Sequence, residues 1–452
     1  MDNINAVILA AGEGTRMKSK MPKVLHEVMG RPMVKRVVDT AKDLEAKNIC
    51  VVTGHMSETV QEALKDEGVS FAVQEKQLGT GHAVMQAEKY INENEDVLIL
   101  YGDTPLIKAE TLEKLIEYHR SENNGVSIIS AIVEDSAGYG HIIRDKDGNF
   151  VKNVEYKDAT PEEKLVKEIN SGIYCFKGSS LKKALKLITN DNAQGEYYLP
   201  DALEIILKSG EKVNAMTIGD VTEFFGVNNR VQLAQANKIM QKRINEKHML
   251  NGVTIIDPTD TYIADDVEIG MDTIIYPGCV LEGKTVIGDD CKIGPDTRLT
   301  DMTLAPNVTI QYTVAMESEI GSGTKVGPFA YIRPNSKIGE NIKIGDFVEV
   351  KNSVIGNGTK VSHLTYIGDS DVGERINFGC GTVTVNYDGH KEFRTTIEDD
   401  VFIGCNANLV APVTLKKGSY VAAGSTITKD VPEKSLAVAR NRQTNIDGWT
   451  KK

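Results

Sequence analysis

The sequence has few cysteines and no long apolar runs, and these absences narrow the class of protein. Its six cysteines are scattered, with neither a CxxC motif nor a spacing paired with histidine, so neither a disulfide framework nor a zinc site is suggested. No apolar stretch is long enough to span a bilayer, and the first residues lack the basic segment and long apolar core of a signal peptide. We therefore expect a soluble, cytoplasmic protein without membrane insertion.

Positive charge is scarce relative to negative charge. The chain carries 64 acidic and 52 basic residues, which gives a formal net charge of −12. This balance argues against nucleic acid or an anionic membrane as the main partner, because both repel a negative surface. A small anionic substrate is compatible with it if basic side chains gather locally.

The length of 452 residues exceeds what a single hydrophobic core organises, and two or three domains are expected. Residues 1–229 alternate apolar β-type runs with helical patterns, which predicts a largely parallel α/β sheet of the nucleotide-binding, Rossmann-like kind. The expected strands cover 6–10, 49–54, 71–74, 96–103, 126–133 and a segment around 173–176. Residues 230–250 contain no Gly or Pro and predict one connecting helix, which leaves 251–452 as the last domain.

An aliphatic residue recurs at every sixth position through most of that last domain. One run reads Ile263, Ile269, Ile275, Leu281, Ile287, Ile293, Leu299. Neither the period of a helix nor that of a strand explains this spacing. Hexapeptide repeats predict a parallel β-helix, in which each short strand buries one aliphatic side chain. The period breaks at 384–396, where we expect a long loop with a functional role, since the coils do not need it.

A glycine-rich turn follows the first expected strand. It reads LAAGEGTRM over 9–17, and Lys23 follows. Small residues let backbone N–H groups approach an anion, and Arg16 and Lys23 would bring positive charge to a phosphate chain. The turn is neither GxGxxG nor a Walker A loop, so a dinucleotide site or a P-loop is not predicted. Taken alone, it is equally well explained as a plain strand-to-helix turn with basic residues on its surface.

Further motifs give the turn a specific meaning. The segment LAAGxGTRM followed by PKVL resembles the signature of sugar-nucleotide pyrophosphorylases, and QLGTGHA and YGD follow at matching positions. With the hexads, essentially the whole chain is similar to the bifunctional bacterial N-acetylglucosamine-1-phosphate uridyltransferase / glucosamine-1-phosphate acetyltransferase family. The resemblance implies an α/β domain, a helical linker and a left-handed parallel β-helix with a C-terminal tail. It also implies a homotrimer whose acetyl-transfer sites lie between subunits.

The implied function is the synthesis of UDP-N-acetylglucosamine, a precursor of cell-wall and envelope polysaccharides. The β-helix would transfer acetyl from acetyl-CoA to glucosamine 1-phosphate. The N-terminal domain would then join the product to UTP and release pyrophosphate, with Mg²⁺ as cofactor. The sugar phosphate would attack the α-phosphorus directly, so positioning and charge neutralisation would replace a covalent protein nucleophile.

For the uridylyl transfer, the resemblance assigns catalysis to Arg16 and Lys23 and the Mg²⁺ ligands to Asp103 and Asn228. By itself an Asp at a strand end is more often a turn or cap residue. The amide of Gln74 offers a donor and an acceptor to the polar edge of uracil. The positions matching contacts to UTP or UDP-N-acetylglucosamine are Leu9, Ala10, Ala11, Gly12, Gly14, Lys23, Gln74, Gly79, Thr80, Tyr101, Gly102, Gly140, Glu155, Asn170 and Asn228.

For the acetyl transfer, the resemblance assigns the catalytic base to His363. Glucosamine must lose an ammonium proton before its nitrogen attacks the thioester, and an imidazole has a suitable pKa. Arg333 and Lys351 lie 18 residues apart, so they would stack if three hexads close one coil. The positions matching glucosamine 1-phosphate contacts are Arg333, Lys351, Tyr366 and Asn377. Those matching acetyl-CoA contacts are Cys380, Asn386, Tyr387, Cys405, Ala423 and Arg440.

Two of these positions depart from the family pattern. Cys380 stands where the family has a small Ala, and Cys405 where it has Ser. Both changes are small, but they put the contacts of those side chains to acetyl-CoA in doubt and predict sensitivity to thiol reagents. A cysteine nucleophile with an acyl-enzyme is disfavoured, because an amine attacks the thioester directly.

Two other functions are possible alternatives to the bifunctional enzyme. In the first, a pyrophosphorylase carries a β-helix that only assembles or regulates it, but His363 and the loop containing Asn386 would then have no use. In the second, the chain is a non-catalytic sensor of sugar nucleotides. Binding alone does not require Asp103 and Asn228 together with the basic residues of the turn, which counts against a sensor.

Overall fold

The computed structural model describes residues 3–192 and 194–450. The chain forms two compact units, residues 1–240 and 241–452. A single helix, α7 (Arg230–Leu250), covers the range for which the sequence predicts a connecting helix, and the boundary between the units falls within it. None of the described helices is long and apolar enough to cross a bilayer.

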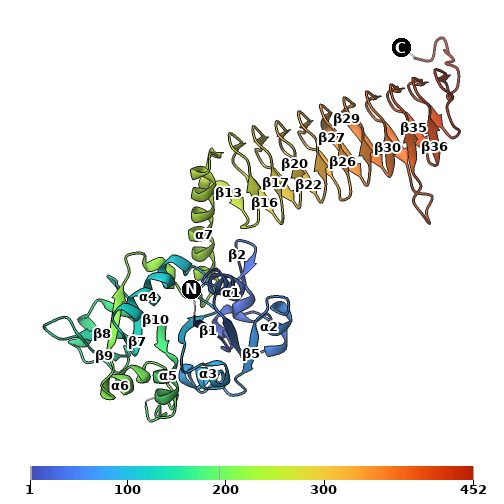
Figure 1. Cartoon of the computed structure of the whole chain (residues 1–452). Coiled ribbons are helices and arrows are strands. Elements are labelled where there is room, and N and C mark those ends of the chain that lie inside the picture. The colour runs from blue at the N-terminus through green and yellow to red at the C-terminus, as the bar shows by residue number, and fades with distance from the viewer. Residues whose placement is uncertain (1–2, 193, 451–452) are drawn as a thin grey trace. The chain divides into compact units, whose positions relative to one another are not determined.

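The first unit is built on a mixed sheet in the order β11-β7-β10-β6-β1-β4-β5 (Figure 1). Its strands are β1 (Ile4–Ala10), β4 (Asn48–Thr53), β5 (Ser70–Val73), β6 (Asp96–Tyr101), β7 (Val126–Ile132), β10 (Glu168–Lys177) and β11 (Val213–Thr217). All six expected strands are therefore present. The expectation of a largely parallel sheet needs one refinement, because β10 runs antiparallel to both β6 and β7. An apolar run predicts a strand but not its direction.

Helices cover both faces of this sheet because its strands are apolar on both sides. In β1, Val7 and Leu9 face one core, and Ile4, Ala6 and Ile8 face the other. The first core is closed by α3 (Thr80–Gln86), α5 (Gly178–Leu185) and α6 (Asp201–Lys208). The second is closed by α1 (Met33–Asp43), α2 (Ser57–Ala63) and α4 (Ala109–Ser121). Two hairpins, β2 (Glu27–Val28) with β3 (Arg31–Pro32) and β8 (His141–Arg144) with β9 (Phe150–Val154), complete the unit.

The second unit is a parallel β-helix that begins against α7. Amides of Gln241 and Asn245, both buried, donate hydrogen bonds to the Thr261 carbonyl at 2.7 and 2.9 Å. The first coils include β13 (Thr261–Ile263) and β16 (Cys279–Glu282), which pair with Ile263 opposite Leu281. An offset of 18 residues means that three hexads close one coil, as the family resemblance implies. The aliphatic residue of each hexad then stacks on its equivalents inside the solenoid, where Ile263, Leu281 and Leu299 have no exposed surface.

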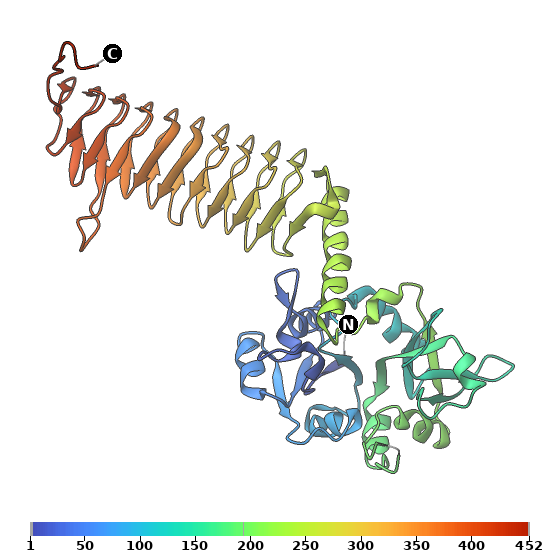
Figure 2. The ribbon, with the colours of Figure 1, turned by 180° about the vertical axis from the view of Figure 1, so that it is seen from behind.

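The coils that contain the residues assigned to acetyl transfer lie toward the C-terminus. They contain β25 (Tyr331–Ile332), β27 (Lys343–Lys351), β29 (Lys360–Gly368), β31 (Asn377–Phe378), β32 (Val383–Val385), β34 (Phe402–Ile403) and β37 (Tyr420–Val421). The loop expected at 384–396 connects β32 to β33 (Thr395–Ile397) and projects from the regular coils (Figures 1 and 2). A bridge between Tyr387 and Glu392 closes it as a short hairpin.

Candidate active sites

A pocket of about 290 Å³ lies at the carboxyl ends of β1, β5 and β6 in the first unit. Parallel strands end at the same edge of the sheet, where α/β proteins place their ligands. The glycine-rich turn contributes backbone to one side of it. The lining residues are Leu9, Ala10, Ala11, Gly12, Lys23, Val24, Gln74, Gln77, Gly79, Thr80, Ala83, Tyr101, Asp103 and Glu196. Ten of these fourteen are residues that the resemblance assigns to the uridylyl transfer.

The four charged and polar groups assigned to catalysis and Mg²⁺ form one cluster. Lys23 Nζ is ion-paired with Asp103 and donates a hydrogen bond to Asn228 Oδ1 at 3.2 Å. Arg16 donates to the same Asn228 oxygen at 3.0 Å. The cluster joins the turn after β1, the end of β6 and the segment that precedes α7. Of the two cations, Lys23 also lines the adjacent pocket.

Asp103 and Asn228 also fit a magnesium ion. Their side-chain oxygens contact the same Lys23 ammonium nitrogen, so both face one point that already accommodates a cation. Mg²⁺ is commonly held by one or two protein oxygens, with phosphates and water completing its shell. Among residues 3–192 and 194–450, no group of three or more His, Cys, Asp or Glu side chains is arranged to hold a metal ion. An ion here would therefore depend on oxygens from the substrate.

Gln74 and Gly79 are held in place before any nucleotide binds. The buried Gln74 amide nitrogen donates to the Gly79 carbonyl at 3.0 Å and contacts His82 Nδ1 at 3.0 Å. The side-chain carbonyl oxygen of Gln74 remains for a ligand. Gly79 has a φ of +105°, and a Cβ there would lie 2.6 Å from the Tyr197 carbonyl oxygen. This position therefore requires glycine on two grounds, backbone conformation and space.

Gly140, Glu155 and Asn170, predicted to contact the acetylated sugar, form a second group in the same unit. Asn170 N–H donates to the Gly140 carbonyl at 2.8 Å, and a Cβ at Gly140 would lie 3.0 Å from Glu155 Oε1. Asn153 joins them, since it accepts a hydrogen bond from Asn170 and donates one to Glu155. Burial, together with nearby carboxylates that include Glu155, raises the pKa of Asp201 to about 6.

Sequence reasoning missed several side chains of this unit. Gln77, Glu196 and Asn153 line the pocket or join the assigned residues, yet no motif marks them. Gln77 and Glu196 lie in loops and Asn153 in β9, and nothing in their spacing indicates the contact.

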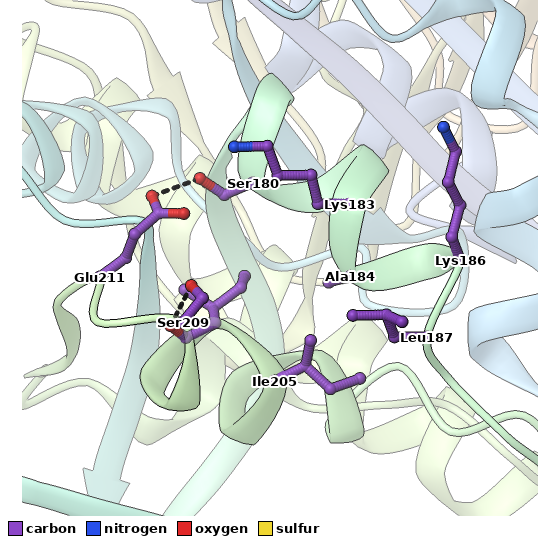
Figure 3. A pocket seen from close by; sticks show the side chains of 9 residues that line it. Ser180, Lys183, Ala184, Lys186, Leu187, Ile205, Ser209 and Glu211 are labelled. Carbon is purple, nitrogen blue, oxygen red and sulfur yellow. Dashed lines mark hydrogen bonds between the residues drawn. The ribbon is translucent and has the colours of Figure 1, made fainter.

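A larger hollow of about 360 Å³ lies elsewhere, between α5 and α6 (Figure 3). Its apolar side contains Ala184, Leu187 and Ile205, and a 2.6 Å hydrogen bond joins Ser180 to Glu211 beside them (Figure 3). It contains none of the residues that the sequence singled out.

In the β-helix, His363 is paired with a carboxylate. His363 Nδ1 lies 2.6 Å from Asp346 Oδ1, and the two residues are in register on the adjacent strands β27 and β29. The hydrogen bond to His363 lowers the pKa of Asp346. The imidazole is 56% exposed, so its other nitrogen is open to a substrate. Asp346 was not predicted, although its position one coil before His363 would have signalled the contact.

The register places further assigned residues at the same corner of the solenoid. Offsets of 17, 25 and 18 residues hold on both sides of the corner within β29 and of the turns after β31 and β34. One position per coil therefore forms a line that we call the corner column: Asp346, His363, Cys380, Cys405 and Ala423. Consecutive members are about 4.8 Å apart along the solenoid, the spacing of neighbouring strands. Arg440 approaches the end of this line, since its Cδ would lie 3.9 Å from a Cβ added at Gly424.

Arg333 and Lys351 stack as the 18-residue spacing predicts. Ile332 pairs with Val350, and the Arg333 N–H donates to the Val350 carbonyl at 2.8 Å. Each cation has an acidic partner. Arg333 is 2.9 Å from Glu349. Lys351 is ion-paired with Glu392 of the projecting hairpin, which raises the pKa of Lys351.

The remaining assigned residues divide between two places. Asn386 is buried and donates to Asp369 at 2.5 Å and to the Tyr366 hydroxyl at 3.4 Å. Asp369 also lies 3.5 Å from Lys351, so this group is continuous with the stacked cations. Asn377 lies apart from them, on β31 between Lys360 and Phe402 of the adjoining face. Tyr387 is exposed on the hairpin.

Two families match parts of the sequence. The MobA-like NTP transferase domain matches residues 6–143. The bacterial transferase hexapeptide family, in its six-repeat form, matches residues 266–301, 317–352 and 394–429. These matches agree with the nucleotidyltransferase fold of the first unit and with a left-handed parallel β-helix in the second.

Several curated proteins are similar to the chain over nearly its whole length. "Bifunctional protein GlmU" of Caldanaerobacter subterraneus subsp. tengcongensis is 58% identical over 449 residues, which cover 99% of this chain and 98% of the relative. The protein of the same name from Thermoanaerobacter pseudethanolicus is 56% identical with the same coverage. That of Clostridioides difficile is 52% identical and covers 100% of this chain and 98% of the relative.

One solved structure is similar to about half of the chain. It is a putative glucose-1-phosphate thymidylyltransferase from Bacillus anthracis in complex with a sucrose, with 23% identity and a TM-score of 0.44. The match spans 52% of this chain and 94% of that structure.

Proposed function

Since the chain belongs to the family of bifunctional GlmU proteins, we propose that residues 1–229 carry its uridylyl transfer and residues 251–452 its acetyl transfer. The protein is a bifunctional transferase of UDP-N-acetylglucosamine synthesis. This division of the two activities between the units is supported by one observation: each unit contains its own group of interacting polar side chains. One is the cluster around Lys23 and Asp103, and the other is the pair of His363 and Asp346.

In the first unit, the glycine-rich turn and Gln74 hold UTP, with its phosphates toward Arg16 and Lys23. Gly140, Glu155 and Asn170 hold N-acetylglucosamine 1-phosphate. Magnesium, held by Asp103 and Asn228, supplies charge neutralisation on the triphosphate when bound. Lys23 leaves its partner Asp103 and binds a phosphate oxygen. The chain's own contribution is thus to align the attacking phosphate with the α-phosphorus and to stabilise the charge that moves to pyrophosphate.

In the second unit, Asp346 holds His363 so that Nδ1–H donates to the carboxylate. The exposed Nε2 then has a free lone pair, which removes a proton from the glucosamine ammonium. The amine attacks the acetyl carbonyl, and CoA leaves as the thiol. The Asn386 amide is held by Asp369, and once it releases the Tyr366 hydroxyl its second N–H stabilises the oxyanion of the tetrahedral intermediate.

The two substrates of this reaction approach from different sides of His363. Arg333, Lys351, Tyr366 and Asn377 bind glucosamine 1-phosphate, and the phosphate displaces Glu392 from Lys351. Acetyl-CoA lies along the later coils against Cys380, Cys405 and Ala423. Asn386, Tyr387 and Arg440 complete its contacts, which places the thioester beside the base.

We further propose that the β-helix forms a homotrimer. An exposed apolar ladder supports this, because the rings of Tyr312, Phe329 and Phe347 follow one another at 5.5 and 5.4 Å, with Phe329 and Phe347 more than half exposed. Exposed apolar patches of this kind mark interaction surfaces. The ladder ends beside Asp346 and His363, so a second copy packed on it would border the acetyl-transfer site. A closed cyclic trimer is a symmetry that such a contact allows.

A split assay on purified protein with Mg²⁺ tests these assignments. One reaction holds glucosamine 1-phosphate and acetyl-CoA and follows thiol release. The other holds N-acetylglucosamine 1-phosphate and UTP and follows pyrophosphate release. We expect both products, and native mass spectrometry should show three chains per particle. Pyrophosphate without thiol release would reduce the β-helix to a scaffold. We also place the reaction in the cytoplasm, where UTP and acetyl-CoA are available.

A further inference from the structure

Two cysteines occupy consecutive positions of the corner column. Phe378 pairs with Ile403 before the turn and Val383 with Asn408 after it, so Cys380 and Cys405 are in register between them. The two turns also touch directly. Asn406 N–H donates to the Cys380 carbonyl at 2.7 Å, and a Cβ at Gly379 would lie 2.5 Å from the Cys405 nitrogen.

This register suits a disulfide. Neighbouring strands place equivalent Cα atoms about 4.8 Å apart, which is inside the range of about 4.4–6.8 Å that disulfides span. Both residues lie at the same corner of the solenoid, and both are accessible, Cys405 exposed and Cys380 partly so. Neither is bonded to another cysteine, and the other four cysteines are buried.

We propose that Cys380 and Cys405 form a dithiol modification site that small-molecule disulfides convert into an intramolecular disulfide. The thiolate of the exposed Cys405 attacks one sulfur of the reagent, forms a mixed disulfide and releases one small thiol. The thiolate of Cys380 then attacks the Cys405 sulfur and releases the second small thiol. Two protons and two electrons leave the protein, and the small disulfide is reduced to two thiols. His363, in register with Cys380 on the preceding coil, is placed to accept the Cys380 proton.

The consequence for catalysis rests on the proposed function, since the corner column is where we place acetyl-CoA. Joining the two sulfurs would change the surface on which the thioester lies, one coil from the base. A displacement of a reacting group by about 1 Å can lower a rate by about 100-fold. We therefore expect acetyl transfer to fall by at least about tenfold. The uridylyl transfer should be unchanged, because no cysteine of the N-terminal pocket takes part.

The buried cysteines of the same chain serve as internal controls. Burial raises the pKa of the Cys50 thiol to about 12 and that of Cys279 to about 11. A thiol reacts through its thiolate, so these groups should stay reduced under conditions that oxidise the column.

The experiment treats the full-length, reduced protein with oxidised glutathione, alkylates the remaining thiols and maps peptides by mass spectrometry. We expect a Cys380–Cys405 disulfide, four alkylated buried cysteines after denaturation, and recovery with dithiothreitol. Cys380→Ser and Cys405→Ser should each stop at a glutathione mixed disulfide. Two free thiols in the wild type, or only a mixed disulfide there, would overturn the proposal.

Both activities are then measured on the same oxidised sample. A selective, reversible loss of acetyl transfer supports the location of the disulfide on the acetyl-CoA path. Disulfide formation with full acetyl transfer would overturn that location. If the reduced protein showed no acetyl transfer, the proposed function would fail instead, while the peptide map would still decide whether the bond forms.

Discussion

The two units build their sites in opposite ways. In the first, the hydrogen bond from Arg16 to Asn228 joins residues 212 positions apart, and the site exists only because the sheet brings distant loops together. In the β-helix, Asp346 and His363 are 17 positions apart, one coil, and the repeat alone places them side by side. A site of the first kind depends on the whole unit, whereas one of the second kind depends on a few adjacent coils.

Replacement of His363 is the strongest test of the comparison. His363→Ala removes the proposed base, and acetyl transfer should fall by about 10²–10⁴-fold, while uridylyl transfer stays at the wild-type rate. His390→Ala, on the projecting hairpin, is the matched control and should leave both reactions unaffected. Both rates are read in the split assay. Wild-type acetyl transfer in His363→Ala would place the base elsewhere.

The converse test removes the carboxylate of the first unit. Asp103→Asn should lower uridylyl transfer by about 10²–10³-fold, as the loss of one group that stabilises transition-state charge does in other enzymes. Acetyl transfer should not change. Asp147→Asn, in the exposed turn of the β8–β9 hairpin, is the control. Loss of both activities in Asp103→Asn would show that the two units do not act separately.

Replacement of Asp346 tests whether two residues that stack on adjacent coils act together in acetyl transfer. Asp346→Asn keeps the size of the side chain but not the charge that orients His363, and acetyl transfer should fall by about 10–100-fold, as for other groups that orient a histidine. The loss should appear in kcat, with little change in KM for glucosamine 1-phosphate, and Asp346→Glu should restore part of it. A change confined to KM would assign Asp346 to substrate binding.

Replacement of Glu392 should have a smaller effect than the variants above, and it should improve substrate binding instead of lowering activity. It is ion-paired with Lys351, and the phosphate of the substrate must displace it. An exposed ion pair contributes about 0.2–1 kcal/mol, so Glu392→Gln should lower KM for glucosamine 1-phosphate by about 1.4- to 5-fold, since a factor of ten corresponds to about 1.4 kcal/mol. Glu374→Gln, which breaks the pair with Arg375, is the control. A raised KM would mean that Glu392 itself contributes to binding.

The smallest effect concerns stability of the first unit alone. The pKa of Asp201 is raised from 3.8 to about 6, so the folded protein holds this proton more tightly than the unfolded chain. The stability that the protonated group contributes is present below pH 3.8 and is lost as the pH rises to about 6. After a discount for partial exposure, Asp201→Asn should stabilise the unit at pH 7.5 by about 1 kcal/mol, or about 2–4 °C in Tm.

Calorimetry at two pH values checks this expectation. The difference between Asp201→Asn and wild type should vanish well below pH 3.8, where Asp201 is protonated in both the folded and the unfolded protein. Asp147→Asn should show no such dependence. A gain that persists at low pH would have a cause other than the charge of Asp201.

The two units also differ in how much of their fold and of their candidate sites the sequence predicted. The hexads predicted a parallel β-helix and, where their period breaks, the projecting loop, because a repeat in sequence is a repeat in space. The coil length that stacks Arg333 on Lys351 came from the family resemblance. In the first unit the apolar runs predicted all six expected strands, but not the direction of β10. The resemblance placed ten residues in the pocket, whereas Gln77 and Glu196 were found only in the structure.

By itself the sequence determined what depends on local pattern: the strands, the connecting helix over 230–250 and the inward aliphatic stacks. Only the tertiary structure decided which polar groups are partners. Only the structure shows that Lys351 lies beside Glu392, His363 beside Asp346 and Cys380 beside Cys405. The physical reason is the separation in sequence of the residues that each property depends on. Backbone conformation and burial follow from nearby residues, but a hydrogen bond or an ion pair requires two groups within a few ångströms, and loops and turns set that distance.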